Sequence, residues 1–148
     1  AHTPDALKSV LEALNPHCKG RVRLVFGCGG DRDQGKRPEM AEVAELFADE
    51  IWLTNDNPRN EDPVVITNDI LAGFSAAETI NVEHDRKKAI EHALGSSNEN
   101  DLVLIAGKGH ETWQEVKGKR NFFSDIDVIR QHFGLCLPLT PGEEVVHD

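Results

Sequence analysis

The sequence is poor in positive charge. Its 148 residues contain 16 lysines and arginines against 26 aspartates and glutamates, which gives a formal net charge of −10 at pH 7. A protein that neutralises the phosphates of a nucleic acid needs an excess of the opposite sign. The composition therefore excludes nucleic acid as the expected partner, and the length favours one compact domain.

Long apolar runs are also absent. No stretch approaches the ~18 consecutive apolar residues of a membrane-spanning helix, and no basic segment followed by an apolar run opens the chain as a secretion signal would. We therefore expect a cytoplasmic protein with no membrane partner. The chain opens on the polar sequence AHTPD without an initiator methionine, so we expect it to be a piece of a longer protein.

Cysteine is scarce. Cys18, Cys28 and Cys136 are odd in number and lack the close paired spacing of a zinc site or a disulfide framework. Reduced thiols in a cytosolic protein are the simplest interpretation. We therefore expect neither a disulfide nor a metal site built from these residues.

Apolar runs alternate with helical patterns along the chain. Short apolar-rich runs between loops indicate strands, and apolar residues at helical spacing after a capping residue or a proline indicate helices. Segments 112–116 and 120–123 flank a glycine and suggest a hairpin at the sheet edge. The expected strands are 21–26, 50–54, 79–82 and 102–106, and the expected helices start at Pro4, Pro38, Pro63, Asp85 and Ser124.

This alternation favours an α/β fold in which an open, mostly parallel sheet carries helices on both faces. We expect residues 1–137 to form the domain. Residues 138–148 contain two prolines, a glycine and an acidic run, so we expect a flexible acidic tail.

Two polar loops follow predicted strands, namely GCGGDRDQGKRP at 27–38 and DNPR at 56–59. Open α/β sheets build their ligand sites at the carboxyl ends of strands. The planar forks of Arg32 and Arg59 are suited to binding carboxylates through paired hydrogen bonds, and the glycines would let the backbone turn sharply. The alternative is a solvated cluster of ion pairs.

A third loop, GKGHE at 107–111, follows the predicted strand 102–106. Glu111 could accept hydrogen bonds from an ammonium group, whereas the alternative is a tight turn with surface charge. His110 and Glu111 do not form a zinc motif, because no second histidine follows at helical spacing.

Nucleotide-binding patterns match incompletely. Gly30 to Lys36 fits the first seven positions of the phosphate loop G-x-x-x-x-G-K, but Arg37 stands where Ser or Thr should hold magnesium. The dinucleotide pattern G-x-G-x-x-G fails at Arg32. Both patterns are therefore disfavoured as autonomous sites.

The motifs together resemble one family. AHTPDAL at 1–7, GCGGDRDQGKRP at 27–38, TNDNPRNE at 54–61 and AGKGHE at 106–111 resemble, in this order, the C-terminal domain of Mur ligases. The likeness is strongest to the branch of the family that adds meso-diaminopimelate to UDP-N-acetylmuramoyl-L-alanyl-D-glutamate in peptidoglycan synthesis. It implies a Rossmann-like domain that binds the incoming amino acid.

The resemblance also implies a division of labour. ATP and Mg²⁺ serve the whole ligase and are bound mainly by a central domain with no counterpart here, so no cofactor and no ligation are expected of this chain alone. The alternative function is a non-catalytic carboxylate-binding or regulatory α/β module. Carried over by motif position, His2 lies near the ATP site, no residue is catalytic or a metal ligand, and the residues that bind meso-diaminopimelate are Arg32, Asp56, Asn57, Arg59, Gly107 and Glu111.

Overall fold

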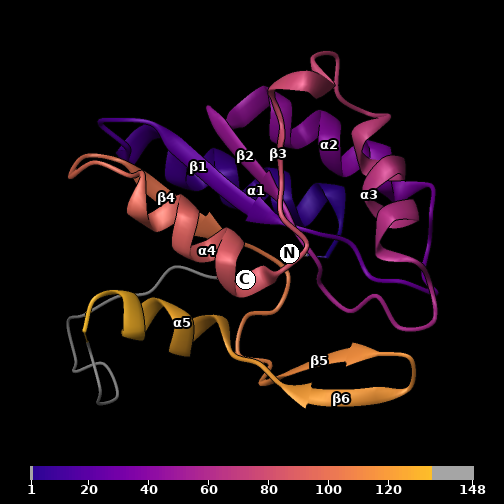
Figure 1. The fold of residues 1–148 in the computed structure, drawn as a ribbon. Helices are drawn as coiled ribbons and strands as arrows, with labels where there is room; N and C mark the ends of the chain where they lie inside the picture. Colours follow the sequence, from indigo (N-terminus) through magenta and orange to yellow (C-terminus); the bar gives the residue numbers. More distant parts are fainter. Residues whose placement is uncertain (1, 135–148) are drawn as a thin grey trace.

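A parallel four-stranded sheet forms the centre of the computed structural model, which describes residues 2–134 (Figure 1). The strand order is β3-β2-β1-β4, and every neighbouring pair is parallel. The α/β class and the parallel sheet predicted from the sequence are thereby confirmed. The strands are β1 Val22–Phe26, β2 Glu50–Leu53, β3 Asn81–Val82 and β4 Leu102–Ile105.

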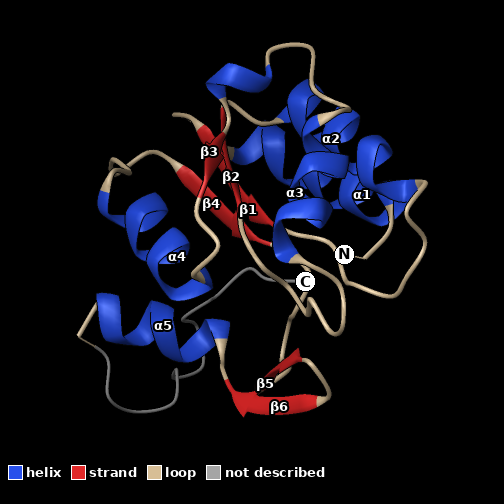
Figure 2. Ribbon diagram, turned by 45° about the vertical axis from the view of Figure 1, so that its right-hand side comes forward, coloured by secondary structure: helices blue, strands red, loops and turns tan. Residues whose placement is uncertain are grey.

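Helices cover both faces of this sheet (Figure 2). On one face lie α1 Pro4–Leu14, α2 Lys36–Phe47 and α3 Pro63–Leu71, and on the other lie α4 Arg86–Gly95 and α5 Asp125–His132. Two short 3₁₀ helices, η1 Asn15–His17 and η2 Ala77–Thr79, complete the helical elements of the described residues.

Strands β1 and β4 contain apolar runs, and their side chains pack against helices on both faces of the sheet. All five residues of β1 are buried, with Leu24 and Phe26 packed among the α1–α3 side chains and Val25 packed with α4 and α5. The side chains of residues 102–105 in β4 also pack alternately against the two groups of helices. A parallel sheet covered on two sides produces such continuous runs.

The predicted helix starts are largely confirmed. The side chains of Thr3, Asp62, Asp85 and Ser124 each accept a hydrogen bond from a backbone amide of the helix that follows. Helix α2 differs, since it begins at Lys36, two residues before the expected Pro38. Proline is tolerated there because the first amides of a helix have no intrahelical acceptor.

The predicted hairpin is present but does not extend the main sheet. Strands β5 Trp113–Val116 and β6 Lys119–Phe122 form a separate antiparallel sheet, which lies apart from β4 in Figure 1. The chain after β4 passes through Gly107 and Gly109, whose φ angles are +113° and +55°. Glycine adopts such angles without steric cost, so the chain can turn away from the sheet edge.

Both cysteines in the described part of the chain are free thiols, as expected. Cys28 is buried, and burial raises the pKa of its thiol to about 12, so it stays protonated at neutral pH. Cys136 and the predicted tail 138–148 lie outside the described residues. Within residues 2–134, no helix has the length and apolar character needed to cross a bilayer.

A buried ion pair fixes α4 against α5. Arg86 Nε donates to Asp125 Oδ1 at 2.7 Å and Nη2 donates to Oδ2 at 2.8 Å, and both side chains are fully buried. Arg86 also donates to the carbonyl oxygens of Asn55 and Ala106, each at 3.1 Å, which follow β2 and β4. The pair therefore ties two helices to two strand ends.

Replacing Asp125 with alanine is expected to lower the free energy of unfolding by about 3–5 kcal/mol, because the Arg86 charge would remain buried without its partner. Urea denaturation of the chain measures this change. Asp127→Ala in the same helical turn is the control and should cost less than about 1 kcal/mol. Equal losses for the two variants would contradict the assigned role of the ion pair.

Candidate functional site

The loops that follow β1, β2 and β4 enclose a cavity of about 230 Å³. It lies at the carboxyl edge of the sheet beside the β1–β4 neighbour pair, where the strand order changes direction, and open α/β sheets bind ligands at such points. The cavity brings together six of the seven residues proposed from the sequence, whereas Gly107 is not among its lining residues. The lining residues are His2, Gly29, Arg32, Lys36, Asp56, Asn57, Arg59 and Glu111.

Arg32 is exposed at the mouth of this cavity. Its Nη1 donates to the carbonyl oxygen of Asp31 at 3.0 Å. That bond uses one of the five N–H donors of a guanidinium group. The remaining fork of Arg32 is accessible to a ligand carboxylate.

Arg59 is held more tightly. Its Nη1 donates to the Gly30 carbonyl oxygen at 3.0 Å, and its Nε lies 3.8 Å from Glu115 Oε1. The φ angle of Arg59 is +53°, a left-handed conformation that costs a non-glycine residue on the order of 1 kcal/mol or more. Surrounding hydrogen bonds must therefore hold this backbone in place.

Two carboxylates of the cavity have unsatisfied oxygens. Asp56 Oδ1 and Glu111 Oε1 are buried and accept no hydrogen bond within the protein. A buried acceptor without a donor costs about 1–3 kcal/mol, and the ammonium group of Lys108, 3.4 Å from Asp56 Oδ1 and 3.9 Å from Glu111 Oε1, offsets part of this cost as an ion pair. The cavity thus combines two guanidinium groups with two carboxylate groups.

Lys108 was not singled out from the sequence and does not line the cavity, yet its ammonium group lies beside two carboxylates that do. The residue is 2% exposed, and its Nζ lies 3.4 Å from Asp56 Oδ1 and 3.9 Å from Glu111 Oε1. Burial lowers the pKa of its ammonium group, and the two carboxylates oppose that shift. Two flanking glycines were the signal available in the sequence, but they do not reveal burial.

Glycine is required in the first loop for close approach. A Cβ atom on Gly30 would lie 1.8 Å from the Pro58 carbonyl oxygen, and one on Gly27 would lie 2.0 Å from that of Thr54. Neither glycine has a positive φ. The sequence-based expectation of a sharp glycine turn is thus corrected, since the left-handed residue is Asp31 at φ +56°.

Arg37 links the first two loops from inside the protein. It is fully buried and donates to Glu61 at 2.6 and 2.9 Å, to Asp69 at 2.9 Å and to the Gly29 carbonyl oxygen at 3.0 Å. The Arg37 guanidinium holds the pKa of Glu61 below its usual range. Arg37 stands at the position where a phosphate loop has a Ser or Thr hydroxyl, and here its guanidinium group has a structural role.

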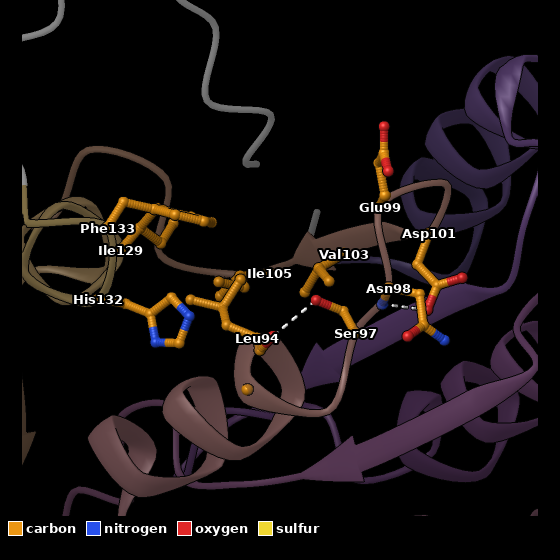
Figure 3. A pocket seen from close by; sticks show the side chains of 11 residues that line it. Leu94, Ser97, Asn98, Glu99, Asp101, Val103, Ile105, Ile129, His132 and Phe133 are labelled. Carbon is orange, nitrogen blue, oxygen red and sulfur yellow. Dashed lines mark hydrogen bonds between the residues drawn. The ribbon is translucent and has the colours of Figure 1, made fainter.

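A larger hollow of about 640 Å³ lies at the free edge of β4 (Figure 3). Its wall includes Leu94, Ile105 and Ile129, and none of the proposed site residues lines it. The Asp101 carboxylate on its rim accepts from the backbone amides of residues 21 and 98 and from a guanidinium Nε, and these bonds lower its pKa to about 2. Because that carboxylate is satisfied internally, the smaller charged cavity is the better candidate site.

Residues 2–134 contain no group of three or more His, Cys, Asp or Glu side chains placed to hold a metal ion. The fold is that of a Rossmann-like domain, and its candidate site brings guanidinium and carboxylate groups into one cavity.

Comparison with known proteins gives the family. The model of the family described as "Mur ligase, glutamate ligase domain" matches residues 1–109, and the chain therefore belongs to this family. Among curated relatives, UDP-N-acetylmuramoyl-L-alanyl-D-glutamate–2,6-diaminopimelate ligase of Vibrio vulnificus is 50% identical over 91% of this chain, and that of Coxiella burnetii is 56% identical over 88%.

A solved structure supports the same family assignment. A UDP-N-acetylmuramoyl-L-alanyl-D-glutamate–2,6-diaminopimelate ligase superposes with a TM-score of 0.86 at 44% identity over 90% of this chain. The chain spans only 28% of that protein and 27% of each of the two curated relatives. It corresponds to about a quarter of such a ligase.

Replacing Gly30 with alanine is expected to destabilise the chain by about 1–3 kcal/mol, because the new methyl group would overlap the Pro58 carbonyl and push two loops apart. Thermal or urea unfolding measures the loss. Gly95→Ala is the matched control, since nothing lies within 4 Å of its Cβ position, and it should be neutral or slightly stabilising. A neutral Gly30→Ala would show that the loops do not need this contact.

Proposed function

We propose that this chain is the amino-acid-binding domain of an ATP-dependent ligase that adds meso-diaminopimelate to UDP-N-acetylmuramoyl-L-alanyl-D-glutamate in peptidoglycan synthesis. The observation that carries the proposal is that one cavity is lined by the guanidinium residues Arg32 and Arg59 together with the carboxylate residues Asp56 and Glu111. The ligase relatives described above favour this function over a regulatory module.

The ligand chemistry matches the cavity. Meso-diaminopimelate carries an ammonium and a carboxylate at each end, so guanidinium forks can bind its carboxylates while carboxylate oxygens accept from an ammonium group. In this proposal a backbone carbonyl at Gly107 adds a further acceptor. Asn57 Oδ1 already accepts from Lys108 and Glu115, which leaves its Nδ2 group as the donor for a ligand.

Arg59 is the proposed selectivity residue. Lysine has the same two amino groups but lacks the second carboxylate. Binding lysine would leave a partly buried guanidinium of Arg59 without its ligand partner, at a cost of about 1–3 kcal/mol. That cost corresponds to a factor of roughly 5 to 150 in affinity.

We propose that ATP and Mg²⁺ are bound mainly by another part of a longer protein. The chain's own donor set does not fit them, because Arg37 replaces the metal-holding hydroxyl of a phosphate loop and is itself buried in ion pairs. His2 lines the cavity, and its carbonyl oxygen accepts from Lys36 Nζ at 2.9 Å. In this proposal His2 lies near the ATP site of the longer protein. The proposed location is the cytoplasm, without membrane or nucleic-acid partners.

Arg59→Ala in the full-length ligase is expected to raise the KM for meso-diaminopimelate about tenfold and to reduce its preference over lysine. Steady-state kinetics with both amino acids measure the change. Arg21→Ala, an exposed arginine at the opposite end of β1, is the matched control and should leave both values unchanged. Unaltered kinetics in Arg59→Ala would refute the proposed pocket.

The 148-residue chain alone is expected neither to hydrolyse ATP nor to form the amide bond. Phosphate release and chromatography of the UDP-linked product measure the two reactions. The full-length ligase under the same conditions is the positive control. Product formed by the isolated chain would contradict the division of labour proposed here.

A further inference from the structure

The hairpin β5–β6 is separate from the main sheet but is bound to the loop that carries Arg59. Arg59 forms a parallel bridge with Val116. Its amide donates to the Glu115 carbonyl oxygen at 2.9 Å, and its own carbonyl oxygen accepts from the amide of Lys117 at 2.7 Å. The hairpin therefore holds the peptide groups on both sides of the left-handed Arg59.

Lys108 lies where the hairpin meets the loops after β2 and β4. Its Nζ donates to Asn57 Oδ1 and to the Trp113 carbonyl oxygen, each at 2.9 Å. The same Asn57 oxygen accepts from the Glu115 amide at 2.9 Å. One buried ammonium group thus connects β5 with Asn57, two residues before Arg59.

Gln114 adds a neighbouring connection, since its Nε2 donates to the Asp56 carbonyl oxygen at 2.9 Å. Without the Lys108 ammonium, however, the Trp113 carbonyl would lose this side-chain donor and Asn57 Oδ1 would keep only the Glu115 amide. Asp56 and Glu111 would also lose the positive charge that lies between them. Loss of these hydrogen bonds and ion pairs inside the protein would weaken the contact between the hairpin and the loop after β2, because each buried acceptor without a donor raises the free energy.

We propose that Lys108 is a positioning residue for ligand selectivity, which joins the hairpin to the Asp56–Arg59 loop and thereby places the Arg59 guanidinium at the cavity. The inference rests on the proposed function, because it concerns the same cavity. Lys108 acts through Arg59 and Asn57 and does not itself bind the ligand carboxylate.

The test uses Lys108→Met in the full-length ligase, since methionine has a similar length but neither charge nor donors. The KM for meso-diaminopimelate is expected to rise about tenfold and the preference over lysine to fall by a similar factor. The kcat and the KM for ATP should stay within about twofold. Lys119→Met on the exposed strand β6 is the matched control and should leave all four values unchanged.

A double variant separates positioning from a purely structural role. If Lys108 acts through Arg59, then Lys108→Met should produce no further loss of preference in an Arg59→Ala background. A purely structural role would lower the melting temperature of each Lys108 variant and leave the preference over lysine intact. If Lys108→Met does not fold, Lys108→Gln, which keeps an amide donor, is judged by the same criteria.

The outcomes distinguish this inference from the proposed function. An Arg59→Ala variant with unchanged preference overturns the proposed function and this inference with it. An altered preference in Arg59→Ala beside an unchanged one in the Lys108 variant overturns the positioning role alone. Additive losses in the double variant also overturn it, because Lys108 would then act independently of Arg59.

Discussion

Backbone carbonyl groups beyond the last paired residue of a parallel strand need hydrogen-bond donors from outside the sheet. In this domain buried cations supply them. Arg86 donates to the carbonyls of Asn55 and Ala106, and Arg37 donates to that of Gly29. Lys108 donates to the carbonyl of Trp113, at the start of β5 in the separate hairpin. Each cation spans segments that are distant in sequence. The shape of the cavity follows from these contacts, because they fix the loops that line it.

The distribution of charge explains how a chain with a net negative charge can gather several cationic side chains at one cavity. Most of the negative charge is distributed over the surface, whereas four cationic side chains stand in or directly beneath one small cavity. Asp56 and Glu111 lie among these cations, so opposite charges alternate over a short distance. A ligand that carries both signs can pair with such a surface at several points, whereas a simple anion or cation would meet repulsion at some of them.

Local sequence signals predicted most of the fold. Apolar runs located the parallel strands, and Thr3, Asp62, Asp85 and Ser124 marked helix starts. Five of the seven proposed residues were brought to one cavity because strand carboxyl ends share an edge, and His2 joins them from the segment before α1. The buried roles of Arg37 and Lys108, and the detachment of the hairpin, depend on partners from other segments of the chain. A charged residue in a loop gives the same sequence signal whether its side chain is solvated or buried. The burial of these side chains is therefore seen only in the three-dimensional structure.

The left-handed backbone at Arg59 has an energetic consequence. Glycine adopts this conformation without strain and asparagine with less strain than arginine, so one substitution would relieve the backbone strain at the cost of the Arg59 side-chain contacts. An arginine at φ +53° therefore carries a backbone cost, which its bonds to Gly30 and to the hairpin must offset.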